Sequence, residues 1–141
     1  MARDPLQVLL RLRGIGLDAA RRALGDRLRE EDLAVARHAG IAASIVRETN
    51  VQLGLPVERR TDDSFVAWLG RTQPVLREAQ AASDACAVAT GEARVALNEA
   101  RAGKRALEAA VEHGREVARE GAERLEQQLV DEAAAASKRV R

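Results

Sequence analysis

The sequence contains two imidazole groups and one thiol, on His38, His113 and Cys86. Such groups act as bases, metal ligands or nucleophiles only where suitable partner side chains are within reach. Glu116 follows His113 at a helical spacing, but one histidine with one glutamate is an incomplete zinc site. Nothing in the sequence places a base beside Cys86. We therefore predict no catalytic residue, no metal site and no cofactor, and a protein that is not an enzyme.

The stretch Gly14-Ile15-Gly16 looks only superficially like a phosphate-binding loop. No strand-like segment precedes it, and neither a Gly-Lys-Ser/Thr sequence nor a third glycine follows. The carboxylates alternate with arginines at spacings of three and four, as in Glu116 and Arg119, which is typical of exposed pairs on a helix. Neither pattern indicates a catalytic site.

The composition is typical of a long-helix protein rather than a layered globule. Of 141 residues, 32% are charged, roughly a fifth are alanine, and the only aromatic residues are Phe65 and Trp68. Few bulky side chains are available to fill a central core, so we expect the buried surface to be a seam between helices. The length suits one domain.

Charge and hydropathy argue against several classes of protein. The formal net charge is +1, and nucleic-acid binding depends on many uncompensated phosphate contacts. A single cysteine excludes an internal disulfide framework and suits a reducing compartment. No apolar run approaches the roughly 20 residues that cross a bilayer. Arg11 and Arg13 interrupt the opening apolar stretch, which makes it a poor export signal. We expect a soluble, cytoplasmic protein.

Signals for helix ends divide the chain at one place. Asp4 and Pro5 are a typical N-cap and first helical residue, and Gln7 is placed for a capping box. Gly54 followed by Pro56 is a stop signal. The sequence predicts helices over about 5–53 and 64–138, with a loop over about 54–63. The face of the first helix contains Leu6, Leu10, Leu17, Leu24, Leu28, Val35, Ala42, Ile45, Val46, Thr49 and Leu53.

The second predicted helix contains a proline and then a coiled-coil pattern. Pro74 lies about three turns in, so we expect it to kink the helix or to divide off a short leading helix. Beyond it, two rows of mostly small residues, with a few bulky apolar ones, follow spacings that alternate between four and three, as in a coiled coil. One row is Ser83, Thr90, Leu97, Lys104, Val111, Ala118 and Leu125, and the other is Cys86, Ala93, Ala100, Leu107, Gly114 and Gly121.

Two such helices would be about 75 and 110 Å long, at about 1.5 Å per residue. Because one short loop joins them, they should fold back on each other. The predicted fold is therefore all-α, a single antiparallel coiled-coil hairpin in which the second helix overhangs the first. The alternative is that one or both helices pair with another chain.

Two clusters of residues are candidates for binding a partner. Six arginines, at positions 11, 13, 21, 22, 27 and 29, are either a solvated helix face or a docking surface for an acidic partner, which Lys138, Arg139 and Arg141 could extend. Nearby carboxylates argue against nucleic acid. Phe65 and Trp68 belong to a stripe that is either core or, if exposed, an anchor for a partner.

Two stretches resemble the flagellar FliJ family. The sequence PLQVLLRLR at 5–13 is similar to the start of these proteins, which commonly carry Pro-Leu, Leu-Leu and arginines in their first turns. The sequence ALEAAVEHGREVAREGAERLEQQLVDEAAAASKR at 106–139 is similar to their tail, particularly Glu126-Gln127 followed by Asp131-Glu132 and small residues. The length and the expected hairpin agree with this resemblance.

The resemblance implies a specific role. FliJ proteins are cytoplasmic components of the flagellar type III export apparatus, and they form antiparallel coiled coils resembling the stalk of rotary ATPases. They dock in the ring of the export ATPase FliI, promote ring assembly, contact the export gate protein FlhA and handle export chaperones. The implied location is peripheral to the inner membrane at the flagellar base, without insertion into the membrane.

The resemblance also implies site residues. The two helical ends would bind the ATPase, through Leu9, Arg11, Leu12 and Arg13 and through Gln127, Asp131 and Glu132. A gate-binding stripe early in the second helix would contain Phe65, Leu69, Thr72 and Leu76. Pro74 within that stripe and the glycines of the first helix depart from the family pattern.

Two alternatives belong beside this interpretation. One is the related stalk protein of a virulence-type secretion system, which genomic neighbours would distinguish. The other is an amphipathic helical protein that binds lipid surfaces, which requires a broad, strongly apolar face flanked by Lys and Arg. The narrow, alanine-rich seam favours a protein partner over a lipid surface.

Overall fold

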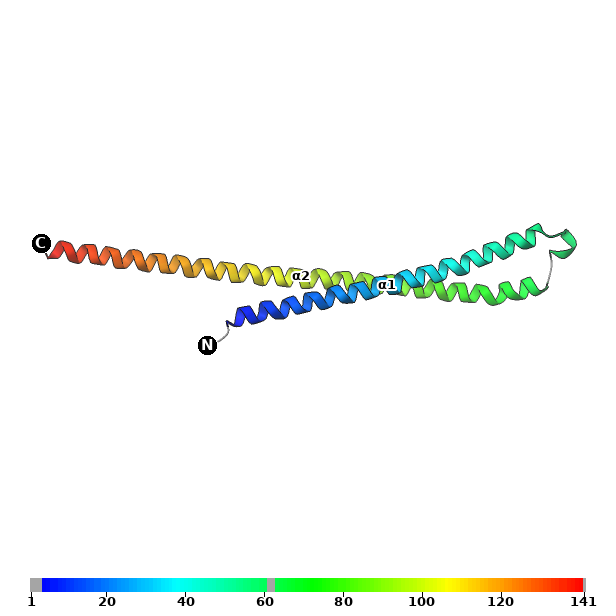
Figure 1. Ribbon diagram of the computed structural model, residues 1–141, viewed down its shortest axis with the longest axis horizontal. Coiled ribbons are helices and arrows are strands. Elements are labelled where there is room, and N and C mark those ends of the chain that lie inside the picture. The colour runs from blue at the N-terminus through cyan, green and yellow to red at the C-terminus, as the bar shows by residue number, and fades with distance from the viewer. Residues whose placement is uncertain (1–3, 61–62, 141) are drawn as a thin grey trace. The chain divides into compact units, whose positions relative to one another are not determined.

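The computed structural model of the chain describes residues 4–60 and 63–140. Helix α1 spans Pro5–Gly54, the 3-10 helix η1 spans Val57–Arg59, and helix α2 spans Asp63–Arg139 (Figure 1). The two long helices pack against each other and the described residues contain no strand, which confirms the predicted all-α hairpin. Thr61 and Asp62 of the predicted loop lie outside the described residues.

Helix α1 begins with the N-cap that the sequence predicts. The Asp4 carboxylate accepts a hydrogen bond of 3.0 Å from the backbone N–H of Leu6, and the Asp4 carbonyl accepts one of 3.1 Å from the N–H of Gln7. Pro5 has no N–H to satisfy at the first helical position. The cap therefore pairs donors that the start of a helix otherwise leaves without partners.

The end of α1 at Gly54 is not the left-handed glycine cap that often ends a helix, since no glycine in the described ranges has a positive φ. The N–H of Leu55 donates to the carbonyl of Gln52 at 3.1 Å. The Arg60 Nε then donates to the Leu55 carbonyl at 2.9 Å. An arginine from the connecting segment thus pairs with the backbone just after the helix. Pro56 prevents α1 from continuing further.

Helix α2 continues through Pro74, so the predicted division of the helix at this residue does not occur. The carbonyl that a helical proline leaves unpaired lies four residues earlier, on Gly70. Both residues are exposed, so water can reach that carbonyl, and Gly70 has no side chain to crowd the ring. In the same region the Thr72 hydroxyl donates to the Trp68 carbonyl at 2.8 Å.

The chain divides into two compact units, each containing part of both helices. In the unit of residues 18–98, α2 lies along α1 with a regular seam. The spacing of its seam residues alternates between four and three without interruption, as in a coiled coil. These buried or half-buried residues of α2 are Phe65, Leu69, Thr72, Leu76, Ala79, Ser83, Cys86, Thr90, Ala93 and Leu97.

The most buried positions of this unit are small residues. Ala79 and Thr90 are each 1% exposed. The Thr90 hydroxyl donates to the backbone carbonyl of Arg27 on α1 at 3.4 Å, which defines which residues face each other. Small seam residues let the helices approach closely but bury little apolar area, so the unit depends on the few bulky residues such as Leu97.

The other unit consists of residues 4–17 and 99–140. Gly103 of α2 lies against the Arg13 side chain, because a Cβ built on this glycine would stand 3.3 Å from a guanidinium nitrogen. Helix α1 begins eight residues before Arg13, at Pro5, and the last buried residue of α2, Val111, lies eight residues after Gly103. The paired part of this unit therefore ends where α1 begins.

Replacing Gly103 with alanine is expected to raise the free energy of unfolding by about 0.5–1 kcal/mol. Alanine has the higher helix propensity, and the neighbour of the new methyl group is the flexible end of Arg13, which can move. Urea unfolding followed by circular dichroism measures the change. Gly91→Ala is the control, because no described atom lies within 4 Å of its new methyl group. A loss of stability for Gly103→Ala alone would show that Arg13 cannot move.

Candidate partner-binding site

The longest run of exposed residues in the described part of the chain lies at the end of α2. Every residue from Glu112 to Val140 is exposed, although the helix continues to Arg139. This C-terminal arm, residues 112–139, is about 40 Å long at about 1.5 Å per residue. Figure 1 shows it in orange to red, extending past the start of α1 in the same unit. The predicted heptad rows thus continue where α1 has no described residue to pair with them.

The C-terminal arm is stabilised by contacts within its own helix. Pairs of opposite charge at three- and four-residue spacings contribute about 0.2–0.5 kcal/mol each. They are Glu112–Arg115 at 3.7 Å, Glu120–Arg124 at 3.4 Å and Arg119–Glu123 at 3.9 Å. Lys138 and Arg139 lie in the last turn, where positive charge complements the helix dipole. These contacts explain how the arm is helical without a partner helix.

An apolar stripe runs along the C-terminal arm. Its residues recur every three or four positions and therefore share one face of the helix. Leu125 and Leu129, at its centre, are 58% and 59% exposed. A row of exposed apolar side chains on one helix face is typical of a surface that pairs with another protein. The stripe comprises Ala118, Ala122, Leu125, Leu129, Ala133 and Ala136.

The four N-terminal candidates lie on the first turns of α1 and are all exposed. Arg11 and Arg13 have no ion pair among the residues that the structure describes, whereas three arginines further along α1 do. Those pairs are Arg21–Asp18, Arg27–Glu30 and Arg29–Asp26. The later part of the basic cluster is therefore largely a solvated, paired helix face. Arg11 and Arg13, beside the exposed Leu9 and Leu12, remain candidates for a docking surface.

The structure does not bring the two halves of the candidate ATPase-binding site together. Arg13 lies against Gly103, whereas Gln127 lies sixteen residues past Val111, or about 24 Å further along α2. Gln127, Asp131 and Glu132 are exposed, and the Gln127 amide donates to the Asp131 carboxylate at 3.0 Å. The register of the helix pair causes this separation.

The same register corrects the expected extension of the basic cluster. Lys138 and Arg139 lie on the C-terminal arm beyond Glu132, so they do not join Arg11 and Arg13 in one patch. Arg141 lies outside the described residues. Arg11 and Arg13 are therefore separate from Lys138 and Arg139 within this unit.

The predicted gate-binding stripe lies in the seam of the 18–98 unit. Phe65, Leu69, Thr72 and Leu76 are half-buried at successive seam positions, so a partner can reach only their outer edges while α1 stays in place. Phe65 also stacks on Trp68, with ring centroids 5.9 Å apart. These contacts favour a core role for the stripe, and its binding to a gate protein stays a prediction.

His38 and Cys86 are both half-buried, although His38 was not among the residues predicted for the buried face of the first helix. Sequence reasoning missed this position because polar residues interrupt the seam of α1. A seven-residue repeat in the sequence of α1 could have identified this position. The half-buried residues at that spacing are Leu24, Glu31, His38, Ile45 and Gln52. Within residues 4–60 and 63–140, no group of three or more His, Cys, Asp or Glu side chains could hold a metal ion.

These features define a class of protein: an all-α helical hairpin whose second helix continues, fully exposed, past the described residues of the first. No helix among the described residues has the length and apolar character needed to span a membrane. No protein-family model matches the chain, and no curated protein or solved structure matches it either.

Proposed function

We propose that the chain is a non-enzymatic coiled-coil component of the flagellar type III export apparatus. Its C-terminal arm would dock in the ring of the export ATPase, like the stalk of a rotary ATPase, and promote ring assembly. The observation that carries the proposal is the exposed helical arm over residues 112–139, with its apolar stripe. The resemblance of residues 5–13 and 106–139 to FliJ proteins is the reason for proposing this partner.

The dimensions of the C-terminal arm suit this role. A single helix with its side chains is about 10–12 Å wide, so it can enter a channel that a helix pair cannot. The two helices pair up to Val111, so the molecule is wider there than along the arm. This increase in width would limit how far the arm enters a ring. Leu125 and Leu129 would then lie inside the ring, where an apolar partner surface would cover them.

Arg11→Glu combined with Arg13→Glu tests the N-terminal part of the proposed ATPase site. These side chains have no ion pair within the described ranges, so charge reversal leaves the ion pairs of the hairpin intact. We expect the affinity for the export ATPase to fall about tenfold, through lost charge complementarity, with unchanged helicity by circular dichroism.

The control for charge reversal is Arg22→Glu combined with Arg37→Glu. Both arginines are exposed on α1 and lie outside the proposed site, and the net charge changes by the same amount. This variant should bind the ATPase as the natural chain does. Equal affinity for both double variants would contradict the assignment of Arg11 and Arg13.

The proposal includes contacts with the export gate and with export chaperones, as in the FliJ family. The half-buried stripe of Phe65, Leu69, Thr72 and Leu76 could present only its outer edges to the gate. The lipid-surface alternative requires a broad apolar face. The arm has a narrow stripe, mostly of alanine, and its neighbours are charged, so a protein partner fits the arm better than a lipid surface does.

A further inference from the structure

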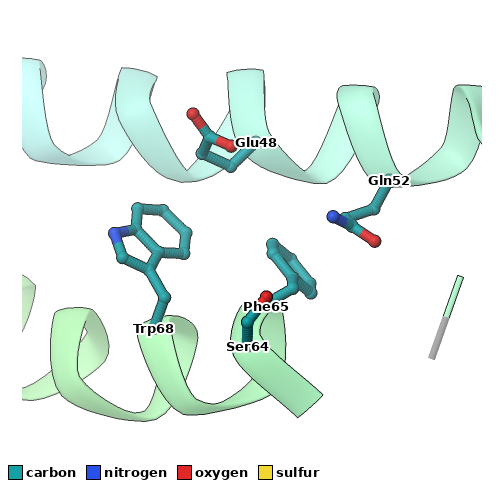
Figure 2. A pocket seen from close by; sticks show the side chains of 5 residues that line it. All are labelled: Glu48, Gln52, Ser64, Phe65 and Trp68. Atoms are coloured by element: carbon teal, nitrogen blue, oxygen red, sulfur yellow. The ribbon is translucent and has the colours of Figure 1, made fainter. Parts of the chain in front are cut away.

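The end of the 18–98 unit near the loop contains a pocket of about 280 Å³ between the two helices. Figure 2 shows Glu48 and Gln52 on α1 and Ser64, Phe65 and Trp68 on α2 around this space. The rings of Phe65 and Trp68 stack with an angle of 27° between their planes. The chain thus presents two aromatic rings from α2 and a carboxylate from α1 to one small pocket.

We propose that this pocket binds an arginine side chain of a partner protein. The inference concerns the chemistry of the pocket and does not rest on the proposed role in flagellar export. It would hold equally for a gate protein, a chaperone or a partner outside any secretion system.

The Glu48 carboxylate is available to pair with such a cation. Glu48 is exposed, and it has no ion pair or hydrogen bond among the residues that the structure describes. Two arginines close to it in sequence are engaged elsewhere: Arg47 donates to the Ser44 hydroxyl at 3.3 Å, and Arg60 donates to the Leu55 carbonyl at 2.9 Å. No described residue therefore pairs with this carboxylate, which leaves it accessible to a cationic ligand.

The aromatic wall favours a guanidinium group over an ammonium group. The face of an indole ring attracts cations, and tryptophan is the strongest aromatic partner for them. A planar guanidinium can stack on Trp68 while its N–H groups point sideways to the Glu48 carboxylate. A lysine ammonium has a compact charge that is strongly hydrated and cannot stack, so it would use the same walls less well.

Gln52 provides a further acceptor. Its Oε1 is buried and has no hydrogen-bond partner within the described part of the chain. Figure 2 shows the amide nitrogen on the side of the aromatic rings, so a half-turn of the amide would bring the oxygen to that side. In that orientation the amide oxygen would face the pocket and could accept a hydrogen bond from a ligand.

A protein side chain suits the pocket better than a free cationic metabolite does. The residues that line the pocket provide a carboxylate, an amide, a hydroxyl and two aromatic rings, and none of them is cationic. Free arginine also carries an α-carboxylate, for which the lining provides no cationic group. An arginine within a protein has no such charge.

Fluorescence of Trp68, the one tryptophan of the chain, reports on the pocket directly. The probe is N-acetyl-arginine N-methylamide, titrated at constant ionic strength. We expect a saturable change in emission, with binding at least about threefold weaker for the matching lysine derivative. The matching citrulline derivative, which has a similar shape without the charge, should give no saturable change. Free arginine should bind no more tightly than the blocked form.

Glu48→Gln is the decisive variant, and Glu92→Gln is its control. Glu92 is another exposed glutamate of the same unit, with no ion pair among the described residues. Glu48→Gln should weaken binding of the arginine probe at least about fivefold, while Glu92→Gln leaves it unchanged. Circular dichroism should show both variants folded. Absence of saturable binding, equal binding of citrulline, tighter binding of free arginine, or equal affinity for the two variants would each overturn the proposal.

Discussion

Leu97→Ala is expected to lower the free energy of unfolding by about 2–5 kcal/mol. Leu97 is 5% exposed and is one of the few bulky side chains in a seam that otherwise contains mostly small residues. Its truncation removes buried apolar area and leaves a cavity that rigid neighbouring helices cannot fill. Urea unfolding followed by circular dichroism measures this loss, which is a large fraction of the stability of a small protein.

Leu125→Ala is the matched control for this experiment. Leu125 occupies the same predicted heptad row as Leu97, but it is 58% exposed on the C-terminal arm. We expect a change of at most about 0.5 kcal/mol, as for most surface substitutions. Similar large losses for both variants would contradict the account, because they would show that the arm is packed against another part of the chain or against a second copy.

Leu125→Asp combined with Leu129→Asp is expected to reduce the affinity for the export ATPase by a factor of more than about one hundred. Burying two carboxylates in an apolar partner surface is strongly unfavourable. Surface plasmon resonance with immobilised ATPase measures the affinity. The urea midpoint of the hairpin should change little, because both leucines are more than half exposed in the free chain.

Val88→Asp combined with Val95→Asp controls for the added charge. These valines of α2 are 63% and 57% exposed and lie outside the C-terminal arm. The variant has the same change in charge and a comparable loss of exposed apolar area, and it should bind the ATPase normally. An equal loss of affinity in both double variants would show that charge, rather than the arm, controls binding.

The helices and the α2 seam could be predicted from the sequence because local signals determine them. Asp4 and Pro5 mark the start of α1, and the four-three spacing from Ser83 to Val111 identifies the face of α2 that is buried. Of the two effects predicted for Pro74, a kink or a division of the helix, the division does not occur. Whether a proline divides a helix depends on how water and neighbouring residues accommodate the unpaired carbonyl, which spacing alone does not show.

The buried face of α1 was only partly predicted. Leu28, Val35, Val46 and Leu53 follow helical spacing, yet all four are exposed. The partner helix imposes a seven-residue repeat on α1, and this repeat passes through polar residues such as Glu31, His38 and Gln52. Hydropathy therefore selects the wrong residues where the seam itself is polar, and only the packing against α2 identifies the face.

The candidate site depends on register, which the sequence does not determine. Loop length and heptad pattern predicted an overhanging second helix, but several registers satisfy the same pattern. The structure sets Arg13 against Gly103 and leaves residues 112–139 without a partner helix. The ATPase-site candidates near the N-terminus and those around Gln127 are consequently separate surfaces, although the resemblance to FliJ proteins assigned both to ATPase binding.

The most direct test of the proposed function is ATP hydrolysis by the flagellar export ATPase of the same organism. It is measured with the full chain and with a chain that ends at Val111, while light scattering follows ring assembly. We expect the full chain to stimulate hydrolysis and assembly, and the shortened chain to fold but do neither. Equal stimulation by both chains, or none by the full chain, would contradict the claim that the C-terminal arm docks in the ATPase ring.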